Sequence, residues 1–209
     1  MRRPHFIAAQ ARHARGLLGR VIAWIMSHET RGDNQRAVGA LELQPTDIVL
    51  DIGTGHGRAL AEIAARTPRG LVTGVDPSEL MVQIARSRNA RLIRSGRVRV
   101  EQGEVARLSF PEATFDKVMA VHVLYFWPDL GGSLKEIMRV LKPGGELALV
   151  FRSAESTRAA ASFPPEIYHF PSQAEVMTSL DAAGFNAIEI GANGVAAGSE
   201  PILVLANKR

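Results

Sequence analysis

The segment VLDIGTGHG, residues 49–57, combines an apolar run, an acidic residue and three closely spaced glycines. Glycines are needed where the backbone turns tightly after a strand and a ligand approaches the main chain closely. A helix starting directly after them offers free amides and the positive end of its dipole to an anionic group. Asp51, at the end of the predicted strand, can accept a hydrogen bond from an ammonium group. The segment therefore predicts a nucleotide-type site whose ligand also carries an amine.

A second acidic residue, Asp76, ends the next apolar segment, VTGVDPS at 72–78, and lies 19 residues after Gly57. At this offset in doubly wound folds a carboxylate accepts hydrogen bonds from the two ribose hydroxyls and repels a 2′-phosphate. Together with the glycine loop, this spacing predicts nucleotide binding. Two alternatives remain. The glycines can serve only tight packing of a helix on a strand, or the chain can bind a dinucleotide such as NAD, which does not account for Asp51.

His122 and three aromatic residues lie at the end of the predicted strand 117–123, in the run HVLYFW. Ligands of open α/β sheets bind beyond the carboxyl ends of the strands, so these side chains are candidates for a substrate site. His122 is a candidate general base because an imidazole is easily poised near neutral pH; the alternative is a structural histidine bonded to the backbone. Tyr125 and Trp127 can wall an acceptor, whereas Phe126 is assigned to the core.

Two segments outside this core can close over the site. HETRGDN, residues 28–34, is expected to be a loop that contributes Asp33. Residues 154–171 fit no regular element and contain Pro164 and Pro165, so they are expected to form an insertion or lid that contributes Tyr168. Asp33 and Tyr168 are candidates for the acceptor site, and a solvated loop position is the alternative for both.

Alternating strands and helices are predicted to position these residues. Continuous apolar strands separated by helices indicate a parallel sheet covered on both faces. The last two strands have no helix between them, which favours an antiparallel hairpin at the end of the sheet. The expected fold class is α/β, a Rossmann-like doubly wound sheet of seven strands, mostly parallel. The predicted strands are 48–52, 71–75, 98–101, 117–123, 146–151, 186–190 and 202–206, and the main helices end near 27, 66, 92, 141 and 183.

The chain is expected to form a single domain over 1–209, since this length suits one sizeable core. We expect an N-terminal helix and lid at 1–36, a ligand-binding core at 37–153, the lid loop at 154–171, and a last helix with two antiparallel strands at 172–209. The N-terminal stretch has apolar residues three and four positions apart and no acidic residue up to 28. Its alternative is an organelle transit peptide, which its low serine content disfavours.

Composition removes several kinds of chemistry. The sequence has no cysteine, so thiolate metal sites, iron–sulfur clusters and cysteine nucleophiles are excluded, and no metal site is expected. No apolar run reaches the length of a membrane span. The net charge of +4 comes from two arginine-rich segments without acidic residues, 1–28 with +5 and 86–99 with +6, while the remaining residues carry −7. A solvated surface is the more common role of such arginines, and RNA binding is the alternative.

The sequence resembles the class I S-adenosylmethionine-dependent methyltransferases, and more narrowly the small single-domain methyltransferases called type 11. The resemblance covers residues 37–151. It rests on VLDIGTGHG and VTGVDPS, on the tract from Gly103 through LSFPEATFDKV, and on RVLKPGGELALV at 139–150. It implies a last helix followed by an antiparallel strand pair, S-adenosylmethionine as the methyl donor and S-adenosylhomocysteine as the product.

The resemblance also implies which residues hold the cofactor. Asp51 and the nearby glycine backbone would hold the methionine part, and Asp76 the ribose hydroxyls. Glu104 stands where the family usually has an aspartate that contacts the adenine amino group, and Thr54 stands where many relatives have cysteine. The implied cofactor-binding residues are Asp51, Gly53, Thr54, Gly55, Asp76, Pro77, Met81, Gly103, Glu104, Val105, Val121 and His122.

These observations lead to an expected function. The chain would transfer a methyl group to O, N or a nucleophilic C of a small molecule, such as a natural product, in the cytoplasm and as a monomer or homodimer. The Asn-Pro-Pro-Tyr and Asp-Pro-Pro-Tyr motifs of relatives that methylate exocyclic amines are absent. One alternative acceptor is RNA, bound by the arginines at 86–99. Another reading makes residues 1–28 a membrane-surface helix and the acceptor a lipid-soluble molecule.

Overall fold

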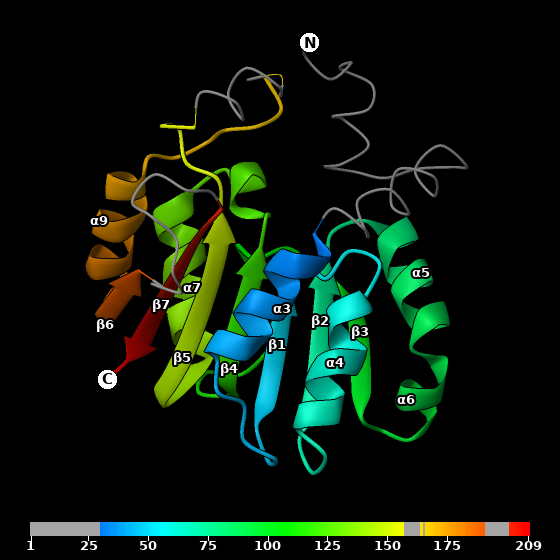
Figure 1. The fold of residues 1–209 in the computed structure, drawn as a ribbon. Helices are drawn as coiled ribbons and strands as arrows, with labels where there is room; N and C mark the ends of the chain where they lie inside the picture. The colour runs from blue at the N-terminus through cyan, green and yellow to red at the C-terminus, as the bar shows by residue number, and fades with distance from the viewer. Residues whose placement is uncertain (1–29, 157–163, 165, 191–200) are drawn as a thin grey trace.

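The computed structural model describes residues 30–156, 164, 166–190 and 201–209 (Figure 1). Their strands form one seven-stranded sheet in the order β3-β2-β1-β4-β5-β7-β6. Strands β1 to β5 pair in parallel, and β7 is antiparallel to both β5 and β6. This sheet confirms the predicted fold class. The strands are β1 (Ile48–Ile52), β2 (Leu71–Asp76), β3 (Val98–Gln102), β4 (Phe115–Val121), β5 (Leu141–Phe151), β6 (Phe185–Ile190) and β7 (Ile202–Lys208).

Helices cover both faces of the sheet (Figure 1). One face is covered by α3, α4 and α5, with the short α6 beside them, and the other by α7 and α9. A single 3₁₀ turn, η1, follows β4. Their bounds are α3 (Arg31–Ala40), α4 (Arg58–Arg66), α5 (Glu79–Arg88), α6 (Ala90–Arg94), η1 (Leu124–Phe126), α7 (Leu130–Val140) and α9 (Gln173–Ala183).

Successive residues of the central strands alternate between two apolar cores. In β4, Val118 and Ala120 belong to the core under α7 and α9, whereas Met119 and Val121 belong to the core under α3, α4 and α5. All four side chains are buried. A strand covered on both faces must be apolar at every position, because neighbouring side chains point to opposite faces. This packing fixes the carboxyl ends of β1, β2 and β4 at one edge of the sheet.

The loop expected at 28–34 is wrong in part, because α3 begins at Arg31. Gly32 and Gly39 lower the intrinsic helix propensity of this segment. Ala37 and Val38 are fully buried against the sheet, and this tertiary packing stabilises the helix in spite of the glycines. Asp33 therefore lies in the first turn of a helix instead of a loop.

Three other predicted boundaries also differ. The single helix expected at 78–92 is divided into α5 and α6, with Asn89 between them. Strand β4 ends at Val121 because His122 has a φ of +57°, a left-handed conformation that cannot continue a strand. Strand β5 starts at Leu141, earlier than expected, and contains an irregularity in its pairing with β4.

Part of the predicted lid at 154–171 is packed into the core. Residues 157–163 and 165 of this lid lie outside the described residues, as does the predicted N-terminal helix up to residue 27. In the described part, the amide of His169 donates to the carbonyl oxygen of Tyr125 at 3.1 Å. The side chain of Tyr168 is buried against the ring of Phe126, with 4.8 Å between the ring centroids. These contacts tie the segment to η1.

Candidate functional site

A cavity of about 210 Å³ lies at the carboxyl edge of the sheet. The segments that follow β1, β2, β3 and β4 line it, and so does the first turn of α3. A doubly wound sheet binds its ligand at the carboxyl edge, at the point where the strand order reverses. Here that point lies between β1 and β4, because β2 and β3 follow on one side and β5 on the other. Every residue of the cofactor-binding set implied by the sequence lines this one cavity.

The glycine loop after β1 is shaped by its glycines. Gly53 and Gly55 have φ values of +68° and +53°, which favour glycine. The amide of Gly53 donates to the carbonyl oxygen of Val75 at 2.7 Å, which holds the loop against β2. A Cβ atom at Gly53 would lie 2.3 Å from Cγ1 of Val123, whereas one at Gly55 would have no atom closer than 3.9 Å. The space beside Gly55 lets a ligand approach the main chain.

Asp51 presents a buried carboxyl group to the cavity. Its side chain is 3% exposed, and one of its oxygens, Oδ2, accepts a hydrogen bond of 2.7 Å from the hydroxyl of Thr54. Burial raises the pKa of Asp51 to about 7, the hydrogen bond from Thr54 opposes this, and the nearby charge of Asp76 raises the pKa further. A cationic group of a ligand would relieve this unfavourable burial. The sequence placed Thr54 among the cofactor-binding residues but did not predict the hydrogen bond from its side chain to Asp51.

Asp76 is held at both carboxylate oxygens. Oδ2 accepts from the amide of Gly55 at 2.8 Å, and Oδ1 accepts from the amide of Ser78 at 2.9 Å. Burial raises the pKa of Asp76, while these two amide hydrogen bonds lower it. Each carboxylate oxygen can accept a second hydrogen bond. The carboxylate is therefore fixed in orientation and still able to accept from a diol.

Another part of the cavity lining, which includes the residue after Asp76, is mostly apolar. Met81 and Val105 are each 7% exposed and both line the cavity, together with Pro77. Glu104 lines the same region and follows the end of β3. Flat apolar walls with one carboxylate at the rim suit a heteroaromatic ring that carries an amino group.

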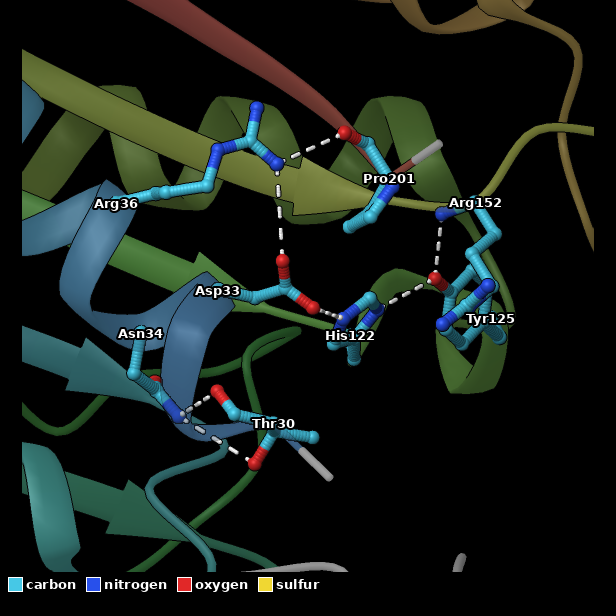
Figure 2. Close-up of polar contacts among 8 residues, drawn as sticks. All are labelled: Thr30, Asp33, Asn34, Arg36, His122, Tyr125, Arg152 and Pro201. Carbon is cyan, nitrogen blue, oxygen red and sulfur yellow. Dashed lines mark hydrogen bonds and ion pairs between the residues drawn. The ribbon is translucent and has the colours of Figure 1, made fainter. Parts of the chain in front are cut away.

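His122 stands between the cavity and α3. Figure 2 shows its ring between Asp33 and Tyr125, with Nε2 2.8 Å from Oδ2 of Asp33 and Nδ1 2.9 Å from the Tyr125 hydroxyl oxygen. The same hydroxyl oxygen accepts a hydrogen bond from the amide of Arg152. Of the five residues proposed from sequence for the acceptor site, His122 and Trp127 line the cavity.

The structure places the other three behind the cavity wall. Asp33 reaches the cavity only through His122. Tyr125 and Tyr168 are buried in an aromatic cluster with Phe126 and Phe170. Within this cluster Phe126, which was assigned to the core, is the residue that lines the cavity. Neither Tyr125 nor Tyr168 lines the cavity, so the structure gives no support for direct contact of these residues with an acceptor.

Sequence reasoning gave no role to four polar residues that line the cavity, Thr30, Asn34, His56 and Ser78. Nδ1 of His56 accepts from the amide of Arg58 and lies 3.2 Å from a guanidinium nitrogen of Arg88. His56 was visible in the sequence, because it stands between two glycines of the loop. Thr30 and Asn34 stand in the segment that supplied Asp33, but only the helical geometry of α3 separates residues that face the cavity from those that do not.

The structure gives half of the arginines at 86–99 an internal role. Arg86 donates to the carbonyl oxygen of Val100, and Arg97 donates to the carbonyl oxygens of Ala64 in α4 and of Thr67 and Gly70 in the α4–β2 connection. Arg88 contacts His56. These contacts weaken the view that the run as a whole is an RNA-binding surface.

The proposed membrane-surface helix at 1–28 lies outside the described residues. Among the residues that the structure describes, no helix has both the length and the apolar character needed to cross a bilayer.

Comparison with known proteins identifies the family. Residues 49–145 match the family described as "Methyltransferase domain". The chain is 30% identical over 170 residues to "Uncharacterized methyltransferase YdaC" of Bacillus subtilis (strain 168). The match covers 81% of this chain and 88% of the relative. It is 37% identical over 114 residues to 27-O-demethylrifamycin SV methyltransferase of Amycolatopsis mediterranei (strain S699), over 54% of this chain and 42% of that protein. The crystal structure of a SAM dependent methyltransferase from Aquifex aeolicus superposes with a TM-score of 0.68 at 26% identity, covering 85% of this chain and 90% of the other.

These similarities agree with the site. The matched residues 49–145 include the glycine loop, Asp76, the Gly103–Glu104 segment and the end of β4. The chain spans nearly all of the Bacillus relative but less than half of the rifamycin enzyme. Its methyl donor is S-adenosylmethionine, and the chain belongs to the class I S-adenosylmethionine-dependent methyltransferases.

Proposed function

We propose that this methyltransferase acts on an O, N or nucleophilic C atom of a small molecule that binds beside His122, Phe126 and Trp127. The observation that carries the proposal is the division of one cavity into two ends. Buried carboxylates and glycine backbone form one end, and an apolar aromatic wall forms the other. A wall of this kind suits a flat or apolar acceptor better than a charged polymer.

The residues of the first end fit S-adenosylmethionine. The buried carboxyl group of Asp51 lacks a cationic partner among the described residues and would accept from the ammonium group of the methionine part. Asp76 would accept from the ribose hydroxyls, and Met81 and Val105 would flank the adenine. The open space beside Gly55 accommodates a ligand against the main chain. When bound, the cofactor supplies a methyl group on a positively charged sulfur.

The second end would align the acceptor and exclude water. Methyl transfer is an in-line displacement at carbon, so alignment of the reacting atoms accounts for much of the rate. Val121, Val123 and Phe126 line the cavity around His122 and present apolar atoms. The rifamycin relative is named for a natural product, which supports a small molecule as acceptor here.

Cofactor binding tests the first end of the site. Isothermal titration calorimetry with S-adenosylhomocysteine should give a micromolar Kd for the parent chain, and Asp51→Ala and Asp76→Ala should each weaken binding more than tenfold. Asp181→Ala is the control, because Asp181 is exposed on α9. Affinities of the Asp51 and Asp76 variants equal to that of the parent would refute the assignment of these two carboxylates to the cofactor site.

Transfer of a labelled methyl group tests the acceptor class. The parent chain is incubated with methyl-labelled S-adenosylmethionine and with either the low-mass fraction or the RNA fraction of a cell extract. We expect label in the low-mass fraction, and Phe126→Ala to reduce it. Label that appears only in RNA and is released by ribonuclease would replace the small-molecule proposal with RNA methylation.

A further inference from the structure

A continuous set of hydrogen bonds joins α3 to the ends of β4 and β5 (Figure 2). It runs from Asp33 in the first turn of α3, through the ring of His122, to the hydroxyl of Tyr125 and the amide of Arg152. The side chains of Asp33 and His122 are 15% and 13% exposed. Residues 89 positions apart in the sequence are therefore joined by short, largely buried contacts.

The direction of each hydrogen bond follows from the groups involved. An ionised carboxylate can only accept, so Nε2 of His122 must carry the hydrogen that lies toward Asp33. The amide of Arg152 can only donate, so it donates to the Tyr125 oxygen. In a neutral imidazole with its hydrogen on Nε2, Nδ1 has a lone pair, and the Tyr125 hydroxyl donates to it. One tautomer of His122 thus satisfies every partner.

Both ring nitrogens of His122 are engaged by the protein in this arrangement. A general base needs a lone pair directed at the proton that it removes, and Nδ1 is occupied by a hydroxyl that lies outside the cavity lining. The φ of +57° at His122 is an unfavourable conformation for a residue with a Cβ, and its amide donates to the carbonyl oxygen of Val150 at 2.8 Å. The surroundings hold this residue in place and favour a structural role, in which the ring is bonded to two side chains and not to the backbone as expected from the sequence.

The same contacts orient the first turn of α3. Asp33 points to His122 and lies 3.6 Å from Arg36, whose guanidinium donates to the carbonyl oxygen of Pro201 at 3.1 Å. Asn34, the next residue, lines the cavity and donates from Nδ2 to the carbonyl oxygen of Thr30 at 3.0 Å. Anchoring of Asp33 on one side of the turn therefore places Thr30 and Asn34 on the cavity wall.

We propose that Asp33 is a positioning residue of this methyltransferase: it fixes His122 as the tautomer with hydrogen on Nε2 and holds the first turn of α3 as one wall of the ligand cavity. His122 acts as the strut between α3 and the end of β4, and the proton of an acceptor is not transferred to its ring. The inference rests on the proposed function, because the wall has a purpose only if the cavity holds the cofactor and acceptor.

The test compares Asp33→Ala, Asp33→Asn and the exposed control Gln35→Ala on the same helical turn. Nitrogen-15 spectra of the imidazole at mildly alkaline pH should show hydrogen on Nε2 in the parent and a mixture of tautomers in Asp33→Ala. The amides of α3 should exchange with solvent about tenfold faster in Asp33→Ala, and the Kd for S-adenosylhomocysteine should rise by about fivefold to tenfold, as expected for loss of a hydrogen bond to a charged group. Asp33→Asn, whose amide oxygen can still accept, should keep the parent tautomer, and Gln35→Ala should match the parent in all three measurements.

Two outcomes would overturn the proposal. An unchanged tautomer in Asp33→Ala would show that Asp33 does not fix the ring, and unchanged exchange of the α3 amides would show that it does not hold the helix. The failure of the proposed function looks different. In that case the parent chain transfers no label from S-adenosylmethionine to the low-mass fraction, while the tautomer and the exchange rates still decide the role of Asp33.

Discussion

At the scale of single residues, Asp51 should make cofactor binding depend on pH. Burial raises its pKa to about 7 in spite of the hydrogen bond from Thr54, and the charge of Asp76 raises it further. In the proposed site the ionised carboxylate accepts from the ammonium group of the cofactor, so Asp51 must lose its proton before the ligand binds. We expect the Kd of S-adenosylhomocysteine, measured by calorimetry, to rise about tenfold for each pH unit below about 7 and to level off above it.

The stability of the ligand-free chain should change with pH in the opposite direction. The pKa of Asp51 in the folded chain lies above its ordinary value of 3.8, so the folded chain binds the proton more tightly than the unfolded chain. The stabilisation from this group is present below about pH 4 and is lost as the pH rises to about 7. Asp51→Asn should flatten both pH curves. Curves for Asp51→Asn that run parallel to those of the parent would contradict the assignment of the raised pKa to Asp51.

The position of Gly53 has no room for a side chain. Its φ is +68°, and a Cβ atom would lie 2.3 Å from Cγ1 of Val123. Gly53→Ala would force the glycine loop away from the end of β4, so we expect the free energy of unfolding to fall by about 2 to 3 kcal/mol. Gly96→Ala is the matched control, because Gly96 has a φ of +73° with nothing within 4 Å of an added Cβ. It should lose only about 1 kcal/mol in urea denaturation. Equal losses would mean that the contact with Val123 is unimportant.

The residue types in the sequence predicted which side chains gather at the site. They did not predict all of the hydrogen bonds between these side chains. Asp51, Asp76 and the glycines could be placed because a strand, a turn and a helix put them at one edge of the sheet whatever the details of packing. The pairing of His122 with Asp33 could not be predicted, since it joins residues 89 positions apart through the docking of α3. The left-handed backbone of His122 also leaves no mark on the sequence pattern, because it is imposed by neighbours in space.

At the scale of elements, Asn89 joins the end of α5 to the start of α4. Its side chain is 2% exposed, and Nδ2 donates to the carbonyl oxygens of Gly57 at 2.8 Å and Ala85 at 2.9 Å. Asn89→Ala would leave both carbonyl groups buried without this donor. We expect the free energy of unfolding to fall by about 1 to 3 kcal/mol and binding of S-adenosylhomocysteine to weaken, because Gly57 ends the glycine loop. Ser87→Ala, on the exposed side of α5, should leave both measurements unchanged, and a similar loss there would contradict this role for Asn89.

The existence of the central strands and of α4 and α7 could be predicted because their apolar patterns are strong and local, and α9 could be predicted because Gly184 marks its end. α3 was missed because only Ala37 and Val38 of its residues are buried, too few for a periodic pattern to stand out among the polar residues and glycines. The break between α5 and α6 was missed for a related reason. The pattern of apolar residues continues across it, and the two carbonyl groups bound by Asn89 belong to different parts of the chain.

At the scale of the whole molecule, the distribution of charge separates arginines that build the fold from those that lie on its surface. The arginines at 86–99 can give the chain an affinity for nucleic acid only if they are free to bind phosphate. Arg97 is half-buried, and its guanidinium donates to the carbonyl oxygens of Gly70, Ala64 and Thr67. It therefore ties the edge strand β3 to the connection between α4 and β2. Arg99, two positions further along β3, is exposed.

This contrast gives a prediction for the pair Arg97→Ala and Arg99→Ala. Removal of the Arg97 guanidinium takes one donor from each of three carbonyl groups, so the free energy of unfolding should fall by about 2 kcal/mol. Arg99→Ala should stay within about 0.5 kcal/mol of the parent in urea denaturation. Both variants should transfer methyl groups to the low-mass fraction as the parent does, provided that Arg97→Ala is assayed well below its melting temperature.

In the opposite case, Arg99→Ala abolishes both methyl transfer and the salt-dependent retention of the chain on RNA. The surface arginines would then be part of an RNA site, because counterion release makes phosphate contacts sensitive to salt. Equal stability of the two variants would show that the carbonyl contacts of Arg97 contribute nothing to the fold.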